Sequence, residues 1–163
     1  KGELMNLLIV IDLQEAFINE NTKEAISKIE KLIETNFYDN IIFTKFINSL
    51  NNPVYTSIKW DKCMSLESQR ILVDTKEYPV FSKETYSILN SYLKDYLVKN
   101  DIKKIYLCGI DIECCVLVSA FNLFENNYDV YVLKDYCFSM NGKETYENAI
   151  GILKRNIGKD RVI

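Results

Sequence analysis

The sequence contains no histidine among its 163 residues. Catalytic pairs in which an imidazole activates a serine or a cysteine are therefore excluded, as is a zinc site with imidazole ligands. Any nucleophile in this chain has to be activated by a carboxylate, by a lysine or by the electrostatic field of the backbone. This restriction limits the search for a functional site to a few residue types.

Proline and glycine are also scarce, with two and five residues, whereas 48% of the residues are hydrophobic. This composition argues against a disordered or collagen-like chain and suffices for one domain with a substantial core. The net charge of −3 offers no basic stripe for nucleic acid, and no apolar run is long enough to cross a membrane. We expect a single domain over residues 1–163, in which residues 1–4 are an addition before a native start at Met5.

The sequence has five cysteines: Cys63, Cys108, Cys114, Cys115 and Cys137. They show neither the even count of a disulfide framework nor the spacing of a metal site. The apolar residues 4–13 include Asp12 and lack a small-residue cleavage site, so they do not predict a signal peptide. These features favour a reducing, cytoplasmic location, and we expect neither a metal nor another cofactor.

The chain is organised around residues 105–139, IYLCGIDIECCVLVSAFNLFENNYDVYVLKDYCFS. The pattern predicts a buried strand at 105–108, a helix at 115–124 and a second buried strand at 130–133. Cys115 would then lie in the first turn of a helix, just beyond the carboxyl end of a strand. The positive end of a helix lowers the pKa of a thiol, and ligands bind at this edge of an α/β sheet. Cys115 is therefore the candidate nucleophile.

The rest of the chain alternates strands with helices. Strands are predicted at 7–11, 41–43, 78–81 and near 162, and helices at 22–33, from 82 or 85 to 98, and at 143–155. The helix that ends at 98 should turn five residues inward: Ile88, Leu89, Tyr92, Leu93 and Tyr96. Residues 48–62 are predicted to be a polar loop, and 63–77 stay unassigned. The alternation favours an α/β fold with a parallel sheet that is covered by helices on both faces.

Three reactive side chains follow predicted strand ends: Asp12, Lys83 and Cys115. Because the carboxyl ends of parallel strands share one edge of a sheet, the three can converge. A carboxylate accepts the proton of a thiol and returns it to a leaving amine, while an ammonium stabilises both anions. Backbone N–H groups at a helix start bind an oxyanion. Attack of the thiolate on a carbonyl carbon would give a thioester that water cleaves.

These residue types also have purely structural interpretations. An aspartate after a strand often caps a helix, a lysine is usually solvated, and a cysteine in an apolar run is usually a small core residue. Cys108 and Cys137 receive the core interpretation, and Cys114 is expected to pack. Five further residues are candidates for a pocket or for the core: Phe17, Tyr55, Trp60, Tyr86 and Ile110.

Three segments together resemble a known family: IVIDLQEAF, SKETYSILNSYL and CGIDIECCVLVSA. In this order and spacing they are similar to the isochorismatase-like cysteine hydrolase superfamily, which includes nicotinamidases, N-carbamoylsarcosine amidases and isochorismatases. The resemblance implies a Rossmann-like, three-layer α/β/α sandwich and a catalytic triad of Asp12, Lys83 and Cys115. Gly109 and Val116 match the family motif and select Cys115 over Cys114.

The resemblance also implies a cis peptide bond between Ile110 and Asp111, which would aim the N–H groups of Asp111 and Cys115 at an oxyanion. It suggests a homo-oligomer, either a dimer or a tetramer. Two features depart from the family pattern. Ile112 stands where threonine is frequent, so support for this turn has to come from elsewhere, and the histidine-containing metal motif of nicotinamidases is missing.

The leading hypothesis is a metal-independent cysteine hydrolase that cleaves a C–N, amide-like bond of a small molecule through a thioester. Asp12 would be the general base and acid, Lys83 the electrostatic partner and Cys115 the nucleophile. The alternative is a non-catalytic member of the same fold that binds a small molecule or serves as an interaction subunit. A thiol redox protein is disfavoured because the sequence has no CxxC pair.

Overall fold

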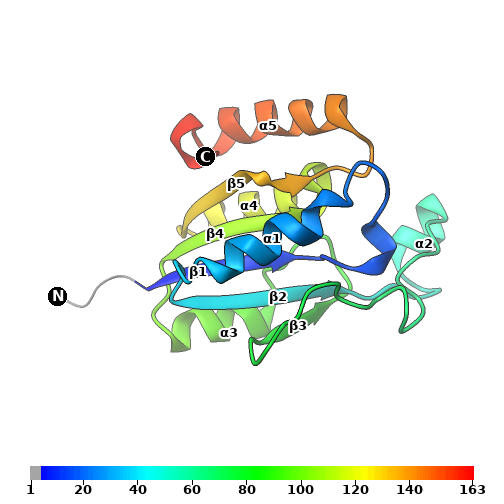
Figure 1. The fold of residues 1–163 in the computed structure, drawn as a ribbon, viewed down its shortest axis with the longest axis horizontal. Helices are drawn as coiled ribbons and strands as arrows, with labels where there is room; N and C mark the ends of the chain where they lie inside the picture. Colours follow the sequence, from blue (N-terminus) through cyan, green and yellow to red (C-terminus); the bar gives the residue numbers. More distant parts are fainter. Residues whose placement is uncertain (1–4) are drawn as a thin grey trace.

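A five-stranded parallel sheet forms the centre of the computed structural model, which describes residues 5–163 (Figure 1). The strand order is β3-β2-β1-β4-β5. The strands are β1 (Asn6–Ile11), β2 (Asn40–Phe46), β3 (Val80–Lys83), β4 (Lys104–Ile110) and β5 (Asp129–Phe138). The predicted parallel sheet is thus confirmed, while the segment 1–4 lies outside the described residues.

Helices cover both faces of this sheet (Figure 1). They are α1 (Glu24–Glu34), α2 (Pro53–Ile58), α3 (Ser91–Lys99), α4 (Leu117–Glu125) and α5 (Lys143–Ile157), with short turns η1 (Glu15–Phe17), η2 (Ile112–Val116) and η3 (Lys159–Arg161). Helix α1 crosses the front face in this view, α3 and α4 lie behind the sheet, and α5 packs against α4 and η2. No helix within residues 5–163 is long and apolar enough to span a membrane.

The central strand β1 explains why the sheet needs two helical layers. Its residues from Leu7 to Ile11 are all 0% exposed, because strands on either side and helices on both faces enclose it. Helix α1 contributes an apolar stripe of buried residues: Ala25, Ile29, Leu32 and Ile33. Burial of such stripes on a continuous apolar strand is the main source of stability of this fold.

The strand order places a topological switch point beside β1. The chain adds β2 and β3 on one side of β1 and then β4 and β5 on the other. Connections leave the carboxyl ends of β1 and β4 in opposite directions, and a crevice forms between them. Asp12 follows β1 and Cys115 follows β4, so both lie at this point.

Several predicted boundaries were wrong. The predicted helix that starts at 82 or 85 begins only at Ser91, after a loop whose Asn90 side chain caps the helix by accepting the N–H of Leu93. Tyr92, predicted to be buried, is 72% exposed, because the helix starts later and turns Leu93 and Leu97 inward. The predicted polar loop 48–62 contains α2, which begins at Pro53 after a capping Asn52.

The carboxyl edge of the sheet also extends further than predicted. β5 continues to Phe138 rather than ending at residue 133, and β3 includes Lys83 instead of ending before it. Cys115 lies in η2, a π-helical turn that precedes α4, rather than in the first turn of an α-helix. Val162 forms an isolated parallel bridge with Val132 where a terminal strand was expected.

Gly109 marks the closest approach of β4 to β1. Its φ is +125°, and an added Cβ would lie 2.0 Å from the carbonyl oxygen of Ile11. Ile11 is also its register partner in the sheet. Both the backbone conformation and the space therefore require glycine directly before the cysteine-bearing turn.

We expect Gly109→Ala to lower the free energy of unfolding by at least about 2 kcal/mol, because it combines an unfavourable φ with a backbone clash. Gly151→Ala is the matched control. Gly151 is exposed within α5 and has no atom near its Cβ position, so alanine there should stabilise the protein by about 0.5–1 kcal/mol. Denaturant unfolding measures both. Similar stability of Gly109→Ala and wild type would contradict this account of the β1–β4 contact.

Candidate active site

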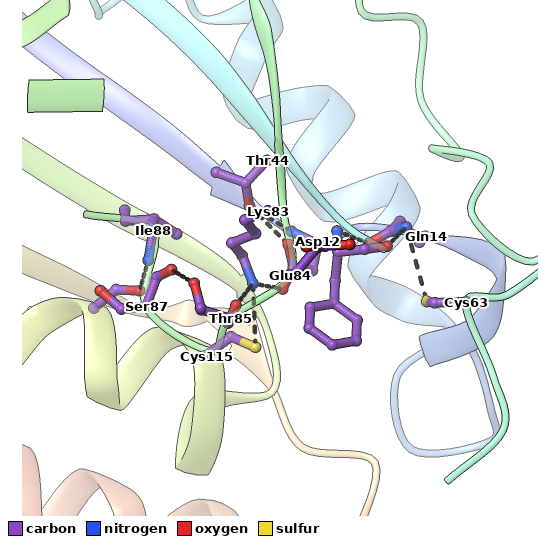
Figure 2. Close-up of polar contacts among 12 residues, drawn as sticks. Asp12, Gln14, Thr44, Cys63, Lys83, Glu84, Thr85, Ser87, Ile88 and Cys115 are labelled. Atoms are coloured by element: carbon purple, nitrogen blue, oxygen red, sulfur yellow. Dashed lines mark hydrogen bonds and ion pairs between the residues drawn. The ribbon is translucent and has the colours of Figure 1, made fainter. Parts of the chain in front are cut away.

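Lys83 at the end of β3 joins the other two candidate catalytic residues in one buried group (Figure 2). Its Nζ lies 2.7 Å from Oδ2 of Asp12 and 3.6 Å from Sγ of Cys115. The exposed fractions are 0% for Asp12 and 4% for each of the other two residues. A carboxylate, an ammonium and a thiol therefore share a site from which water is nearly excluded.

Asp12 is held in place by Thr44 on β2. The Thr44 hydroxyl donates to Oδ1 of Asp12 at 2.7 Å and accepts the backbone N–H of Asp12 at 3.2 Å. The φ of Asp12 is +50°, a conformation that aspartate adopts more readily than most residues. Sequence reasoning gave Thr44 no role, although a hydroxyl near the end of the apolar run IIFTKF was a usable signal.

Gln14 fixes the segment that follows Asp12. Its Nε2 donates to the carbonyl oxygens of Phe46 and Gln69, each at 3.0 Å, and its Oε1 accepts the N–H of Phe46 at 2.8 Å. The side chain is 0% exposed, so these contacts satisfy an amide that would otherwise be buried without partners. Gln14 thereby ties the end of β1 to β2 and to the region 63–77 (Figure 2).

Helix α4 holds the loop that follows β3 and contacts the Lys83 ammonium. The carbonyl oxygen of Thr85 accepts from Nζ of Lys83 at 2.9 Å, which gives the ammonium a third partner. Ser119 Oγ on α4 accepts the N–H of Ile88 at 3.1 Å, and Asn122 donates to Ser87 Oγ at 2.7 Å. Because Cys115 lies directly before α4, the helix positions the thiol and the lysine together.

A cavity of about 310 Å³ opens beside Cys115. Its lining residues are Phe17, Phe46, Val54, Ile58, Trp60, Tyr86, Asp111, Glu113, Cys114, Cys115, Met140 and Asn141. The rings of Phe17 and Trp60 stack with centroids 5.4 Å apart. Its volume suits a small molecule, and its walls combine aromatic rings with carboxylates and thiols.

Three of the five predicted pocket residues line this cavity: Phe17, Trp60 and Tyr86. Tyr55 lies on α2 outside the lining, and Ile110, the last residue of β4, is 0% exposed in the core. Met140 and Asn141 were missed because the predicted strand stopped at residue 133, which left the end of β5 too far from the site.

The backbone carbonyl of Asp111 closes the turn around Cys115. The carbonyl oxygen of Asp111 accepts the N–H groups on either side, those of Cys114 at 3.1 Å and Val116 at 3.2 Å. The peptide bond between Ile110 and Asp111 is cis, as the family resemblance implied. Asp111 and Cys115 both border the cavity.

Support for this turn comes from the segment after β5, not from the Ile112 side chain, which is 0% exposed and packs in the core. Oδ1 of Asp111 accepts the N–H of Met140 at 2.7 Å. Oε1 of Glu113 accepts from Ser139 Oγ at 2.8 Å and from Asn141 Nδ2 at 3.0 Å. Two carboxylates thus connect this turn to the segment after β5.

Residues 6–159 match the family model described as the Isochorismatase domain. The chain belongs to the isochorismatase family. The chain is 26% identical over 160 residues to isochorismatase family protein 2A of Dictyostelium discoideum. It is 28% identical over 144 residues to isochorismatase family protein 1A of the same organism. The alignments cover 91% and 85% of this chain but 74% and 66% of the two relatives, so the chain spans about two thirds to three quarters of their length.

Solved structures share the fold of this isochorismatase-family hydrolase. An isochorismatase-like hydrolase from Alkaliphilus metalliredigens aligns with a TM-score of 0.82 at 17% identity, covering 94% of this chain and 93% of that one. A pyrazinamidase of Pyrococcus horikoshii in complex with zinc aligns with a TM-score of 0.80 at 23% identity, covering 97% and 98%. The yeast nicotinamidase aligns with a TM-score of 0.79 at 21% identity, covering 94% and 98%.

The donor set of this isochorismatase-family chain does not fit the zinc of the pyrazinamidase complex. The chain has no histidine, and within residues 5–163 no three side chains of cysteine, aspartate or glutamate gather as metal ligands. A zinc site in proteins needs three or four such ligands. No catalytic step is therefore assigned to a metal.

The charges of the buried group decide which residue is protonated. Burial lowers the pKa of Lys83, but the attraction of Asp12 and Cys115 outweighs it, so the pKa lies above its usual value. Hydrogen bonding with the Cys114 thiol, burial and the Asp12 charge all raise the pKa of Cys115, and Lys83 opposes them only in part. The expected lowering by a helix end is wrong, because the hydrogen bond with Cys114 and burial favour the neutral thiol, and Asp12 already supplies the anion that pairs with Lys83.

Asp12→Asn should therefore make Cys115 more reactive. The change removes a charge that raises the pKa of Cys115 and leaves the thiolate as the only anionic partner of Lys83. A lower pKa increases the thiolate fraction at neutral pH, so we expect iodoacetamide to alkylate Cys115 about tenfold faster at pH 7 than in the wild-type chain.

Mass spectrometry that separates Cys114 from Cys115, repeated over a range of pH, measures this rate. Asp95→Asn is the matched control, since it removes the same charge at an exposed position on α3 and should leave the rate unchanged. Equal or slower alkylation in Asp12→Asn would disprove this charge arrangement.

Proposed function

We propose that this chain hydrolyses a C–N, amide-like bond of a small molecule through a thioester on Cys115, without a metal. The observation that carries the proposal is the contact of one ammonium, Nζ of Lys83, with Oδ2 of Asp12 at 2.7 Å and Sγ of Cys115 at 3.6 Å. A structural ion pair needs only the carboxylate. A thiol on the same ammonium, at the wall of a cavity, is the arrangement that nucleophilic catalysis uses.

The first half of the reaction forms the thioester. Asp12 takes the proton of Cys115 while Sγ attacks the carbonyl carbon, and the N–H groups of Asp111 and Cys115 hold the resulting oxyanion. When the tetrahedral intermediate collapses, the C–N bond breaks and Asp12 gives the proton to the leaving nitrogen. Ammonia or an amine departs, and the acyl group stays on Cys115.

The second half consumes one water. Asp12 removes a proton from the water as its oxygen attacks the thioester carbon, which gives a second oxyanion in the same site. Collapse of this intermediate breaks the C–S bond and releases a carboxylic acid. The Cys115 thiolate recovers its proton from Asp12, so the enzyme returns to its starting state.

Lys83 keeps the charge of the site balanced throughout these steps. The negative charge lies first on Asp12, then on Sγ of Cys115 and then on the oxyanion, while the ammonium stays between the first two positions. In a buried site an unpaired charge is costly, so a fixed cation lowers the energy of each transfer.

The non-catalytic alternative is less well supported. It would be favoured by a Lys83 side chain that turned toward solvent, but this residue is 4% exposed and has three polar partners around its ammonium. A binding protein without chemistry gains little stability from a buried ion pair next to a thiol.

We expect Cys115→Ala to lower turnover of the substrate by at least about a thousandfold while the fold is kept, because the variant lacks the nucleophile. Cys114→Ala separates the two adjacent thiols and should retain turnover within about tenfold, since that thiol carries no step. The wild-type chain should also gain the mass of the acyl group at Cys115 when it is quenched during turnover.

The measurement is a screen of small primary amides by ammonia release, with circular dichroism as the check of folding. Nicotinamide and pyrazinamide belong in the screen because two solved structures with the same fold are a nicotinamidase and a pyrazinamidase. Full activity in Cys115→Ala, or an acyl group on another residue, would refute the mechanism.

A further inference from the structure

We propose that the substrate of this site carries a cationic nitrogen, an ammonium or an amidinium, which Glu113 and Asp111 attract to the cavity wall next to Cys115. This inference rests on the proposed amide hydrolysis and adds the charge of the substrate to it. The observations are the charge of the cavity lining, the partners of the two carboxylates and the aromatic rings that complete the wall.

The lining of the cavity is acidic. Among the described residues that line it, Asp111 and Glu113 are acidic, and none is a lysine or an arginine. Lys83 does not reach the cavity as a free cation, because its ammonium is 2.7 Å from Asp12 and the side chain is buried. An anionic substrate would meet the Glu113 carboxylate without a counter-ion, whereas a cation would be attracted to it and would favour the ionised form of Asp111.

The hydrogen-bond partners of the Glu113 carboxylate are neutral groups. Its Oε1 accepts from Ser139 and Asn141, but its Oε2 is buried and has no hydrogen-bond partner in the described part of the chain. Both contacts of Oε1 orient the carboxylate without neutralising it. Because Oε2 is buried, a cation in the cavity would act on this carboxylate through its electrostatic field rather than through a direct hydrogen bond, and it would offset an unfavourable buried charge.

Asp111 adds a second carboxylate beside the first. Its Oδ1 accepts the N–H of Met140, and it forms no ion pair with a lysine or arginine within residues 5–163. Burial raises the pKa of Asp111 to about 7; the hydrogen bond from Met140 opposes this, and the charges of Glu113 and Asp12 add to it. Asp111 is therefore only partly ionised near pH 7, and a bound cation would favour its ionised form and offset its repulsion with Glu113 and Asp12.

The aromatic lining suits the same ligand. The stacked rings of Phe17 and Trp60 and the partly exposed Tyr86 present π faces, which attract cations and pack against the apolar stem of a small amine. An enclosure of rings and carboxylates is a common way to bind ammonium groups. A cavity of about 310 Å³ leaves room for a ring or a short chain between the amide and the cation.

The test compares three amides that share a benzamide core and differ in the charge at the para position. They are 4-(aminomethyl)benzamide, 4-ethylbenzamide and 4-carbamoylphenylacetate, which are cationic, neutral and anionic. Calorimetric binding to Cys115→Ala measures the preference without turnover. We expect the cationic amide to bind about tenfold more tightly than the neutral one, and the anionic amide to bind most weakly.

Glu113→Gln keeps the contacts of Oε1 and removes the charge, so the preference for the cationic over the neutral amide should fall below about threefold in that background. The affinity for the neutral amide should stay nearly the same. Asp111→Asn is the second variant, with the same expected loss of preference. Glu30→Gln is the control, since it removes a carboxylate at an exposed position on α1 and should keep the preference.

Three results would overturn the inference: no binding of any of the three amides at millimolar concentration, a preference for the neutral or anionic amide, or an unchanged preference in both Glu113→Gln and Asp111→Asn. Each of them leaves the amide screen with the wild-type chain as a separate test of hydrolysis. Conversely, cation preference in binding without hydrolysis of any amide would refute the proposed function and keep the cation site.

Discussion

A buried ammonium requires a counter-charge, and this constraint governs the edge of the sheet where the site lies. Lys83 ends β3, Asp12 follows β1, and β2 runs between the two strands. The lysine therefore has to cross β2, where its ammonium passes over the ring of Phe46 at 5.1 Å and Thr44 holds the carboxylate. Removal of either charge leaves the other unpaired and costs about 3–5 kcal/mol, so the pair fixes geometry more than it adds stability.

The same edge depends on how closely β4 approaches β1. Gly109 allows the two backbones to touch before the chain turns through Asp111 to Cys115. The segment after β5 then completes the turn through Met140 and Ser139, which bond to Asp111 and Glu113. The ends of three strands, β1, β4 and β5, thus position the thiol. Of these, only β4 directly precedes the Cys115 turn in the sequence. Such contacts keep a nucleophile and its proton acceptor in the relative orientation that the reaction requires.

The sequence predicted the parts of the structure that depend on local patterns. Apolar runs located β1 and β4, and the residues after them located Asp12 and Cys115. Helix α2 was missed because its six residues, which begin at Pro53, show too little periodicity, although Asn52 and Pro53 are a common helix start. The roles of Asn141 and Met140 depend on contacts across some thirty residues of chain, which no local pattern reports.

The direction predicted for the pKa of Cys115 was wrong because that pKa also depends on contacts between distant residues. The Asp12 carboxylate and a Cys115 thiolate would compete for the same ammonium, that of Lys83. The Lys83 ammonium pairs with Asp12, while Asp111 and Glu113 add two further carboxyl groups at the wall of the cavity. With Asp12 paired to Lys83, a thiolate would be a further buried negative charge, so the site favours the protonated form of Cys115. A cationic substrate changes this balance, because its charge lowers the energy of every anion near it. Binding and activation would then be one event: the thiol becomes a better nucleophile only when the molecule that it attacks has entered the cavity.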